Sequence, residues 1–164
     1  MNEQADQSLS ATYSLARRLF YWLPPFLWMG AIFWFSTDTF SAGNTGSILE
    51  PLLRWLFPQI THAQINLVHF LIRKAGHFTV YAVLALLLMR AFRSGSAVNW
   101  RLRWALAACL IISLYALSDE YHQAFTRTRG ASVYDSFIDM AGGFSTIGFL
   151  GLKNWWRSKR GADC

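Results

Sequence analysis

The chain has 164 residues, enough for one domain, and is 54% hydrophobic and 16% aromatic but only 15% charged. Soluble domains average about 25% charged residues, so this composition argues against an ordinary soluble protein. The net charge of +6 comes from Lys and Arg residues that flank apolar blocks instead of forming a basic stripe, which disfavours nucleic-acid binding. The sequence therefore predicts a single-domain integral membrane protein over residues 1–164.

Four apolar blocks approach the length of about 20 residues that a membrane-spanning helix needs. They are Leu19–Phe35, Gly76–Phe92, Leu102–Leu117 and Ile138–Trp155. Pro24-Pro25 lies inside the first block, where it either kinks the helix or marks its start. We therefore predict an all-α membrane protein with four transmembrane helices.

A long segment, Thr37–Ala75, separates the first two blocks. Its start is rich in Gly, Ser, Thr and Asn, which indicates a loop. The apolar pieces Ile48–Phe57 and Ala63–Ile72 follow, divided by Pro58, and each is too short to cross a bilayer. Apolar residues recur at helical spacing, so we expect an interfacial or re-entrant helical segment between the first and second spans.

Lys and Arg residues are unevenly distributed between the two sides that four crossings would create. One side receives Arg17, Arg18, Arg90, Arg93, Arg101, Arg103, Lys153, Arg157, Lys159 and Arg160. The other receives half as many, namely Arg54, Arg73, Lys74, Arg127 and Arg129. Because positive charge is retained in the cytoplasm, this bias predicts a multi-pass protein with both termini cytoplasmic.

Ionisable residues gather at three helix ends. Lys74, His77 and Tyr81 share one face at the start of the second block, by i, i+3 and i+7 spacing. Asp119, His122 and Gln123 share a face at the end of the third block, with Glu120 beside them. Arg129, Asp135 and Asp139 lead into the fourth. With four crossings these three ends meet on the non-cytoplasmic side, so we expect a polar pocket there.

These residue types suit several kinds of site. The candidates for acid/base catalysis are His77, His122, Asp119 and Glu120. The candidates for holding a substrate, above all its phosphate, are Lys74, Tyr81, Gln123 and Arg129. Asp135 and Asp139, one helical turn apart, are candidate ligands for a divalent metal. A metal-free network of ion pairs that ties the helices together explains the same charges, and Ser36 with His77 as base is a further, weaker option.

The three motifs together resemble the VanZ-like family of bacterial membrane proteins. The resemblance covers about residues 36–151 and is carried by Lys74-x-x-His77-x-x-x-Tyr81, by Asp119-Glu120-Tyr121-His122-Gln123 and by Arg129 with the two following aspartates. Family members usually have Pro-Gly before the arginine, whereas Arg127-Thr128 stands here, so the turn is built differently. The resemblance implies a cell-envelope protein of the bacterial cytoplasmic membrane, in a family whose namesake is associated with resistance to a lipid-bearing glycopeptide antibiotic.

Two functions remain open at this level. In the first, the outward-facing pocket recognises or processes the anionic headgroup of an envelope lipid or lipid-linked glycan precursor, with or without a divalent metal. In the second, the chain is a non-enzymatic accessory protein that gives resistance to the antibiotic, and its charges form a structural network. A proton-coupled transporter is disfavoured because the acids cluster at one end instead of lining a path.

Overall fold

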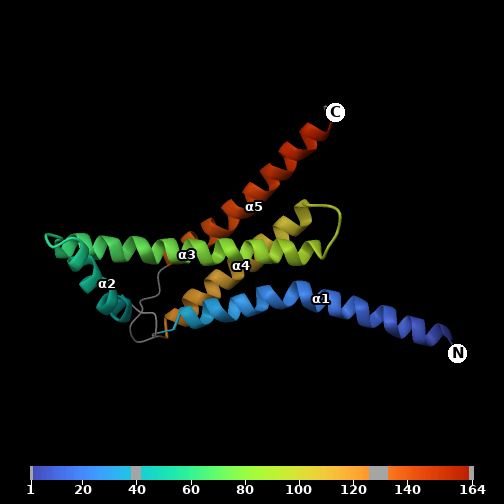
Figure 1. The fold of residues 1–164 in the computed structure, drawn as a ribbon, viewed down its shortest axis with the longest axis horizontal. Helices are drawn as coiled ribbons and strands as arrows, with labels where there is room; N and C mark the ends of the chain where they lie inside the picture. Colours follow the sequence, from blue (N-terminus) through green and yellow to red (C-terminus); the bar gives the residue numbers. More distant parts are fainter. Residues whose placement is uncertain (1, 38–41, 126–132, 163–164) are drawn as a thin grey trace.

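In the computed structural model, residues 2–37, 42–125 and 133–162 are described, and they form five helices without a strand. The helices are α1 (Asn2–Phe35), α2 (Ala42–Leu56), α3 (His62–Arg93), α4 (Leu102–Gln123) and α5 (Val133–Ala162). Figure 1 shows α3, α4 and α5 crossing one another, α1 running beside them, and α2 folded back near the start of α3. The all-α prediction is therefore confirmed.

Helices α3 and α4 are the two that are long and apolar enough to cross a membrane within the described residues. Only 33% of the most apolar stretch of each is buried inside the protein. Large apolar side chains of the other helices are exposed as well, among them Phe26 and Leu27 on α1 and Phe149 on α5. This exposure is typical of a membrane protein and not of a soluble bundle.

The boundaries of α1 show where its two prolines lie, which the sequence left open. Helix α1 continues through Pro24 and Pro25 to Phe35, so the two prolines lie inside it and do not mark its start. Its ribbon changes direction partway along its length (Figure 1), as expected where proline removes backbone donors.

The second apolar piece is not a separate interfacial helix. Ile48–Phe57 falls largely in α2, but Ala63–Ile72 is the beginning of α3 and continues into the second predicted span. Thr61 caps this start. Its hydroxyl accepts a hydrogen bond from the backbone N–H of Gln64, and the Gln64 side-chain oxygen accepts one from the backbone N–H of Thr61. At about 1.5 Å per residue α3 is roughly 48 Å long, more than the ~30 Å of a hydrocarbon core.

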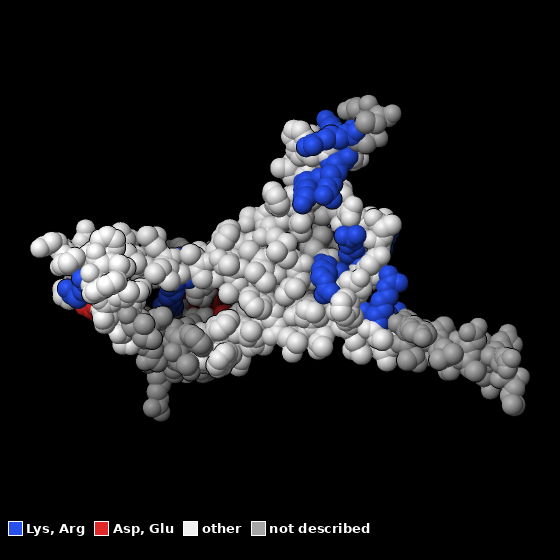
Figure 2. Space-filling view, in the orientation of Figure 1, with Lys and Arg blue, Asp and Glu red and all other residues white. Residues whose placement is uncertain are grey.

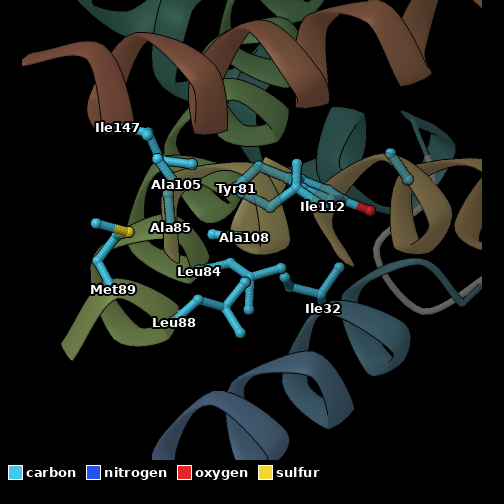
Figure 3. Packing of buried hydrophobic residues seen from close by; sticks show 11 residues of the cluster. Ile32, Tyr81, Leu84, Ala85, Leu88, Met89, Ala105, Ala108, Ile112 and Ile147 are labelled. Carbon is cyan, nitrogen blue, oxygen red and sulfur yellow. The ribbon is translucent and has the colours of Figure 1, made fainter. Parts of the chain in front are cut away.

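The core lies between α1, α3, α4 and α5, and small residues dominate its α4 side. Leu84, Ala85 and Leu88 of α3 pack with Ala105, Ala108 and Ile112 of α4, Ile147 of α5 and Ile32 of α1 (Figure 3). Lipid tails are as apolar as leucine, so association of such helices depends on close packing. Alanines allow that closeness.

Two glycines bring α5 against its two neighbours, α3 and α4. A Cβ on Gly142 would lie 2.2 Å from the Phe78 carbonyl oxygen of α3, and one on Gly143 would lie 2.8 Å from the Ile112 side chain of α4. Gly148 is different, since a Cβ there would meet nothing within 4 Å. Close approach of the helices therefore depends on Gly142 and Gly143 and not on Gly148.

Candidate binding site at one end of the bundle

Contacts between helices gather the predicted ionisable residues at one end of the bundle, which we call the ionisable end. It is built from Ser36, Arg73, Lys74, His77, Asp119, Gln123, Asp135 and Asp139, contributed by α1, α3, α4 and α5. The expectation that separate helix ends meet is thus met by direct contacts. Arg127 and Arg129 lie outside the described residues.

Two carboxylates of α5 face bases of α3 at successive turns. Asp135 is 1% exposed and forms an ion pair with Lys74, and its other oxygen lies 3.6 Å from the guanidinium of Arg73. Asp139 is fully buried, and its Oδ1 lies 3.0 Å from His77 Nδ1. Both contacts form because α3 and α5 run in the same direction. Lys74 and His77 are one turn apart on α3, and their partners Asp135 and Asp139 are one turn apart on α5. Pairing offsets the cost of burying these charges.

Asp119 on α4 accepts hydrogen bonds from Ser36, the residue after the end of α1, and from Gln123 of its own helix. Ser36 Oγ donates a hydrogen bond of 2.8 Å to Asp119 Oδ2, and Gln123 Nε2 donates one of 3.1 Å to the same oxygen. The Ser36 hydroxyl therefore bonds to a carboxylate and not to His77. The option of Ser36 as a nucleophile activated by His77 has no hydrogen bond to support it among the described side chains.

The other two candidate catalytic residues, His122 and Glu120, are in the same part of α4 but outside the contacts described so far. His122 stacks on Phe33 of α1, with ring centroids 4.1 Å apart. Phe33 is one turn before Ser36, the partner of Asp119. Asp119 and His122 therefore share the predicted face of α4, and this face is turned towards α1. Glu120 is 6% exposed. Neither His122 nor Glu120 lines the cavity described next.

A cavity of about 530 Å³ opens beside the ionisable end, between α1, α2, α3 and the end of α4. Its walls are mostly apolar and include Ile32, Phe35, Leu49, Phe70, Ile72 and Val80. Its polar lining consists of Ser36, Asn66, His69, Arg73, His77, Tyr81 and Asp119. An apolar cavity with a few converging polar groups is the usual form of a site for an amphiphilic molecule.

Three of these lining residues carry buried polar atoms without a hydrogen-bond partner among the described residues. The atoms are Arg73 Nε, the Tyr81 hydroxyl and Asp119 Oδ1. Buried polar atoms are normally paired, and an unpaired one costs free energy. The three atoms are a hydrogen-bond donor, a hydroxyl that can donate or accept, and an acceptor.

Metal binding by Asp135 and Asp139 stays a prediction. Among the described residues, no group of three or more His, Cys, Asp and Glu side chains is arranged to hold a metal ion. Each of the two aspartates already faces a basic side chain of α3. The structure therefore adds nothing that favours a metal at this position.

Sequence reasoning missed several residues of the cavity. Arg73 had been counted only as a charge for orientation, yet it borders the cavity and contacts Asp135. Asn66 and His69 line the cavity because the first turns of α3 continue the helix that carries His77. Their i, i+3 and i+7 spacing to Arg73 was a usable signal, but only once α3 was known to be unbroken. Lys74 is paired with Asp135 and does not border the cavity, and its role as a substrate contact stays a prediction.

Comparison with known proteins identifies the family. The family model described as VanZ/LLP1 matches residues 20–154. The match spans most of the chain, so the chain belongs to the VanZ/LLP1 family, as its motifs indicated. No curated protein and no solved structure matches it.

Proposed function

We propose that this member of the VanZ/LLP1 family binds an envelope lipid or lipid-linked glycan precursor in the 530 Å³ cavity, with the anionic headgroup among the polar side chains. The supporting observation is the combination of apolar walls with the three unpaired buried atoms of Arg73, Tyr81 and Asp119. The lipid chain would lie along the apolar walls. The headgroup would take the hydrogen bonds that the protein leaves unmade.

The mixed charge of the cavity restricts the headgroup. Arg73 offers Nε to a phosphate oxygen, and an arginine near an anion gives charge-assisted hydrogen bonds. Asp119 Oδ1 would repel phosphate, but it accepts a hydrogen bond from a hydroxyl. A phosphate ester that also carries hydroxyls, as a lipid-linked glycan does, fits both groups better than a bare phosphate.

The same arrangement supports a processing step as well as binding. Asp139 contacts His77 Nδ1, which leaves Nε2 as the ring nitrogen for a bound molecule. A carboxylate on one imidazole nitrogen orients the ring and stabilises its protonated form. His77 is therefore the residue that would move a proton, with Asp139 positioning it.

We place the ionisable end on the outer face of the bacterial cytoplasmic membrane, with α1 and α5 crossing beside α3 and α4 and both termini in the cytoplasm. The Lys and Arg bias towards the opposite end supports this orientation. A site on the outer face would be accessible to the headgroups of envelope lipids in the outer leaflet and to a glycopeptide outside the cell.

A second candidate function is the non-enzymatic accessory protein, in a family linked to glycopeptide resistance. It is favoured by the pairing of Asp135 with Lys74, of Asp139 with His77 and of Asp119 with Ser36, which are all contacts between helices. In this case the charges hold the bundle together and no headgroup chemistry takes place.

Binding of a matched lipid pair tests the lead proposal. Full-length protein in neutral detergent is titrated with a polyprenyl monophosphate and with the corresponding polyprenol, and thermal unfolding reports binding. We expect the phosphate to bind at least tenfold more tightly to wild type, and Arg73→Gln to remove most of that preference, since a charge-assisted hydrogen bond contributes about 1.5–3 kcal/mol. Arg54→Gln is the control, because Arg54 pairs with Glu50 on α2 and does not line the cavity.

Tyr81→Phe separates binding from structure. The Tyr81 hydroxyl has no described partner, so its removal should leave stability unchanged or raise it, and should weaken headgroup binding. Equal affinity for the alcohol and the phosphate in wild type would refute headgroup recognition. Unchanged antibiotic resistance in cells that express Arg73→Gln, Tyr81→Phe or His77→Gln at wild-type levels would favour the accessory role.

A further inference from the structure

A second pocket lies at the opposite end of the bundle, which we call the basic end. It measures about 270 Å³ and is bordered by Arg90 and Arg93 of α3, Lys153 and Arg157 of α5, and two asparagines, Asn99 and Asn154. Figure 2 shows Lys and Arg side chains gathered at this end, while the acidic side chains coloured on this face are visible only towards the other end.

The four positive charges of this pocket have no described counter-charge. None of them forms an ion pair with an acid among the side chains that the structure describes. The acids whose side chains the structure describes are Glu50, Asp119, Glu120, Asp135 and Asp139, and none of them borders this pocket. Like charges held together in this way favour the entry of an anion.

Neighbouring groups hold two of these cations in place. The Arg90 guanidinium lies 4.8 Å from the ring centroid of Phe20 and 4.9 Å from that of Tyr21, both on α1. Arg93 Nε donates a hydrogen bond of 3.0 Å to the Ser96 carbonyl in the connection between α3 and α4. The pocket is therefore partly ordered before any ligand binds, which lowers the entropy lost on binding.

Apolar surface adjoins the charged groups. Leu86, Met89 and Leu150 line the pocket itself. Lys153 and Arg157 also border a second hollow, whose other residues include the exposed Phe149, Leu152 and Trp156. A soluble anion would leave this apolar surface uncovered, whereas the acyl chains of a lipid would cover it.

We infer that the basic-end pocket binds the phosphates of an anionic phospholipid from the leaflet at that end. Four cations suit a headgroup with two phosphates, two cations to each, and the apolar hollow beside them suits its acyl chains. The site is separate from the cavity at the ionisable end, and it does not depend on the function proposed for that cavity. Basic pockets between membrane helices are known to take such headgroups.

The general retention of positive charge in the cytoplasm does not by itself explain the pocket. Arg18 and Arg103 lie near the same end and are exposed, yet neither lines the pocket. They add to the charge bias without converging on a common point. This difference provides a control in which the net charge changes equally while the pocket stays intact.

Thermal unfolding of the full chain in neutral maltoside detergent, titrated with cardiolipin, tests the inference. We expect cardiolipin to stabilise wild type and the Arg93→Gln/Arg157→Gln variant to bind it roughly 25-fold more weakly, because each Lys or Arg beside an anionic lipid contributes about a fivefold factor. The matched Arg18→Gln/Arg103→Gln variant should change affinity less than threefold. Asn154→Asp, which places a carboxylate in the pocket wall, should also weaken binding and replaces the double variant if that does not fold.

Three outcomes would overturn the inference. Equal weakening in the two double variants would mean that a diffuse field attracts the lipid and no pocket binds it. Equal stabilisation by zwitterionic phosphatidylcholine would show that the phosphate charge is not recognised. Equal stabilisation by inorganic pyrophosphate at the same concentration would assign the pocket to a soluble anion.

Discussion

Gly142 on α5 is the position where a single methyl group should disturb the molecule most clearly. Its ideal Cβ would lie 2.2 Å from the carbonyl oxygen and 3.0 Å from the Cα of Phe78 on α3. Ordinary contact begins near 3.4 Å, so Gly142→Ala requires the two helices to separate by about 1.2 Å. The obstacle is backbone, and no side-chain rotation removes it.

The expected cost follows from two opposing effects. Overpacking costs about 1–3 kcal/mol, and the rigid contact places this variant in the upper part of that range. Alanine is intrinsically better than glycine in a helix by about 1 kcal/mol, which offsets part of the cost. We therefore expect Gly142→Ala to lower the free energy of unfolding by about 1–2 kcal/mol. Gly148→Ala, where a Cβ meets nothing within 4 Å, should raise it by up to about 1 kcal/mol.

The assay is equilibrium unfolding in mixed micelles with increasing SDS, followed by tryptophan fluorescence and circular dichroism. The same variant should weaken polyprenyl phosphate binding, because Phe78 follows His77 and a shift of 1.2 Å exceeds what the 3.0 Å contact with Asp139 tolerates. If Gly142→Ala is as stable as Gly148→Ala, then α3 and α5 do not approach as described, and the pairing of their ionisable residues loses its basis.

Two more predictions concern the ion pairs and the orientation. Asp135→Asn leaves Lys74 and Arg73 without their buried carboxylate and should lower the free energy of unfolding by about 2–4 kcal/mol in the same SDS titration. Adding Lys74→Gln should recover part of that loss, and a loss that simply adds would argue against the pairing. Four crossings predict that, in a background without native cysteines, a cysteine at Ser96 reacts with a membrane-impermeant maleimide only in permeabilised cells. A cysteine at Thr126, outside the described residues, should react in intact cells, and labelling of both from one side would contradict the topology.

The membrane class and the meeting of the polar helix ends could be predicted from the sequence. Apolar blocks of spanning length separated by Lys and Arg leave few other folds open, since backbone groups in lipid must be satisfied within helices. Helical periodicity also placed Lys74 with His77, and Asp135 with Asp139, on common faces before any contact was known. The motif formed by these residues was specific enough to indicate the family.

Only the tertiary structure decided which partners face each other. Periodicity fixes the face that a residue occupies on its own helix, but the rotation and axial shift between two helices depend on packing, here on Gly142 against Phe78. That packing sets Lys74 opposite Asp135 and His77 opposite Asp139. Ser36 donates its hydrogen bond to Asp119.

The cavity could not be predicted from local sequence patterns either. It exists because α3 continues unbroken from His62 and α2 lies against its first turns, so that Leu49 and Arg73 border the same space. Pro58 does separate α2 from α3, but the division expected between Ala63–Ile72 and the second predicted span is absent, because α3 is one long helix. A helix of this length persists because its capped start and its packing outweigh the weak local preference of the polar residues between the two apolar stretches.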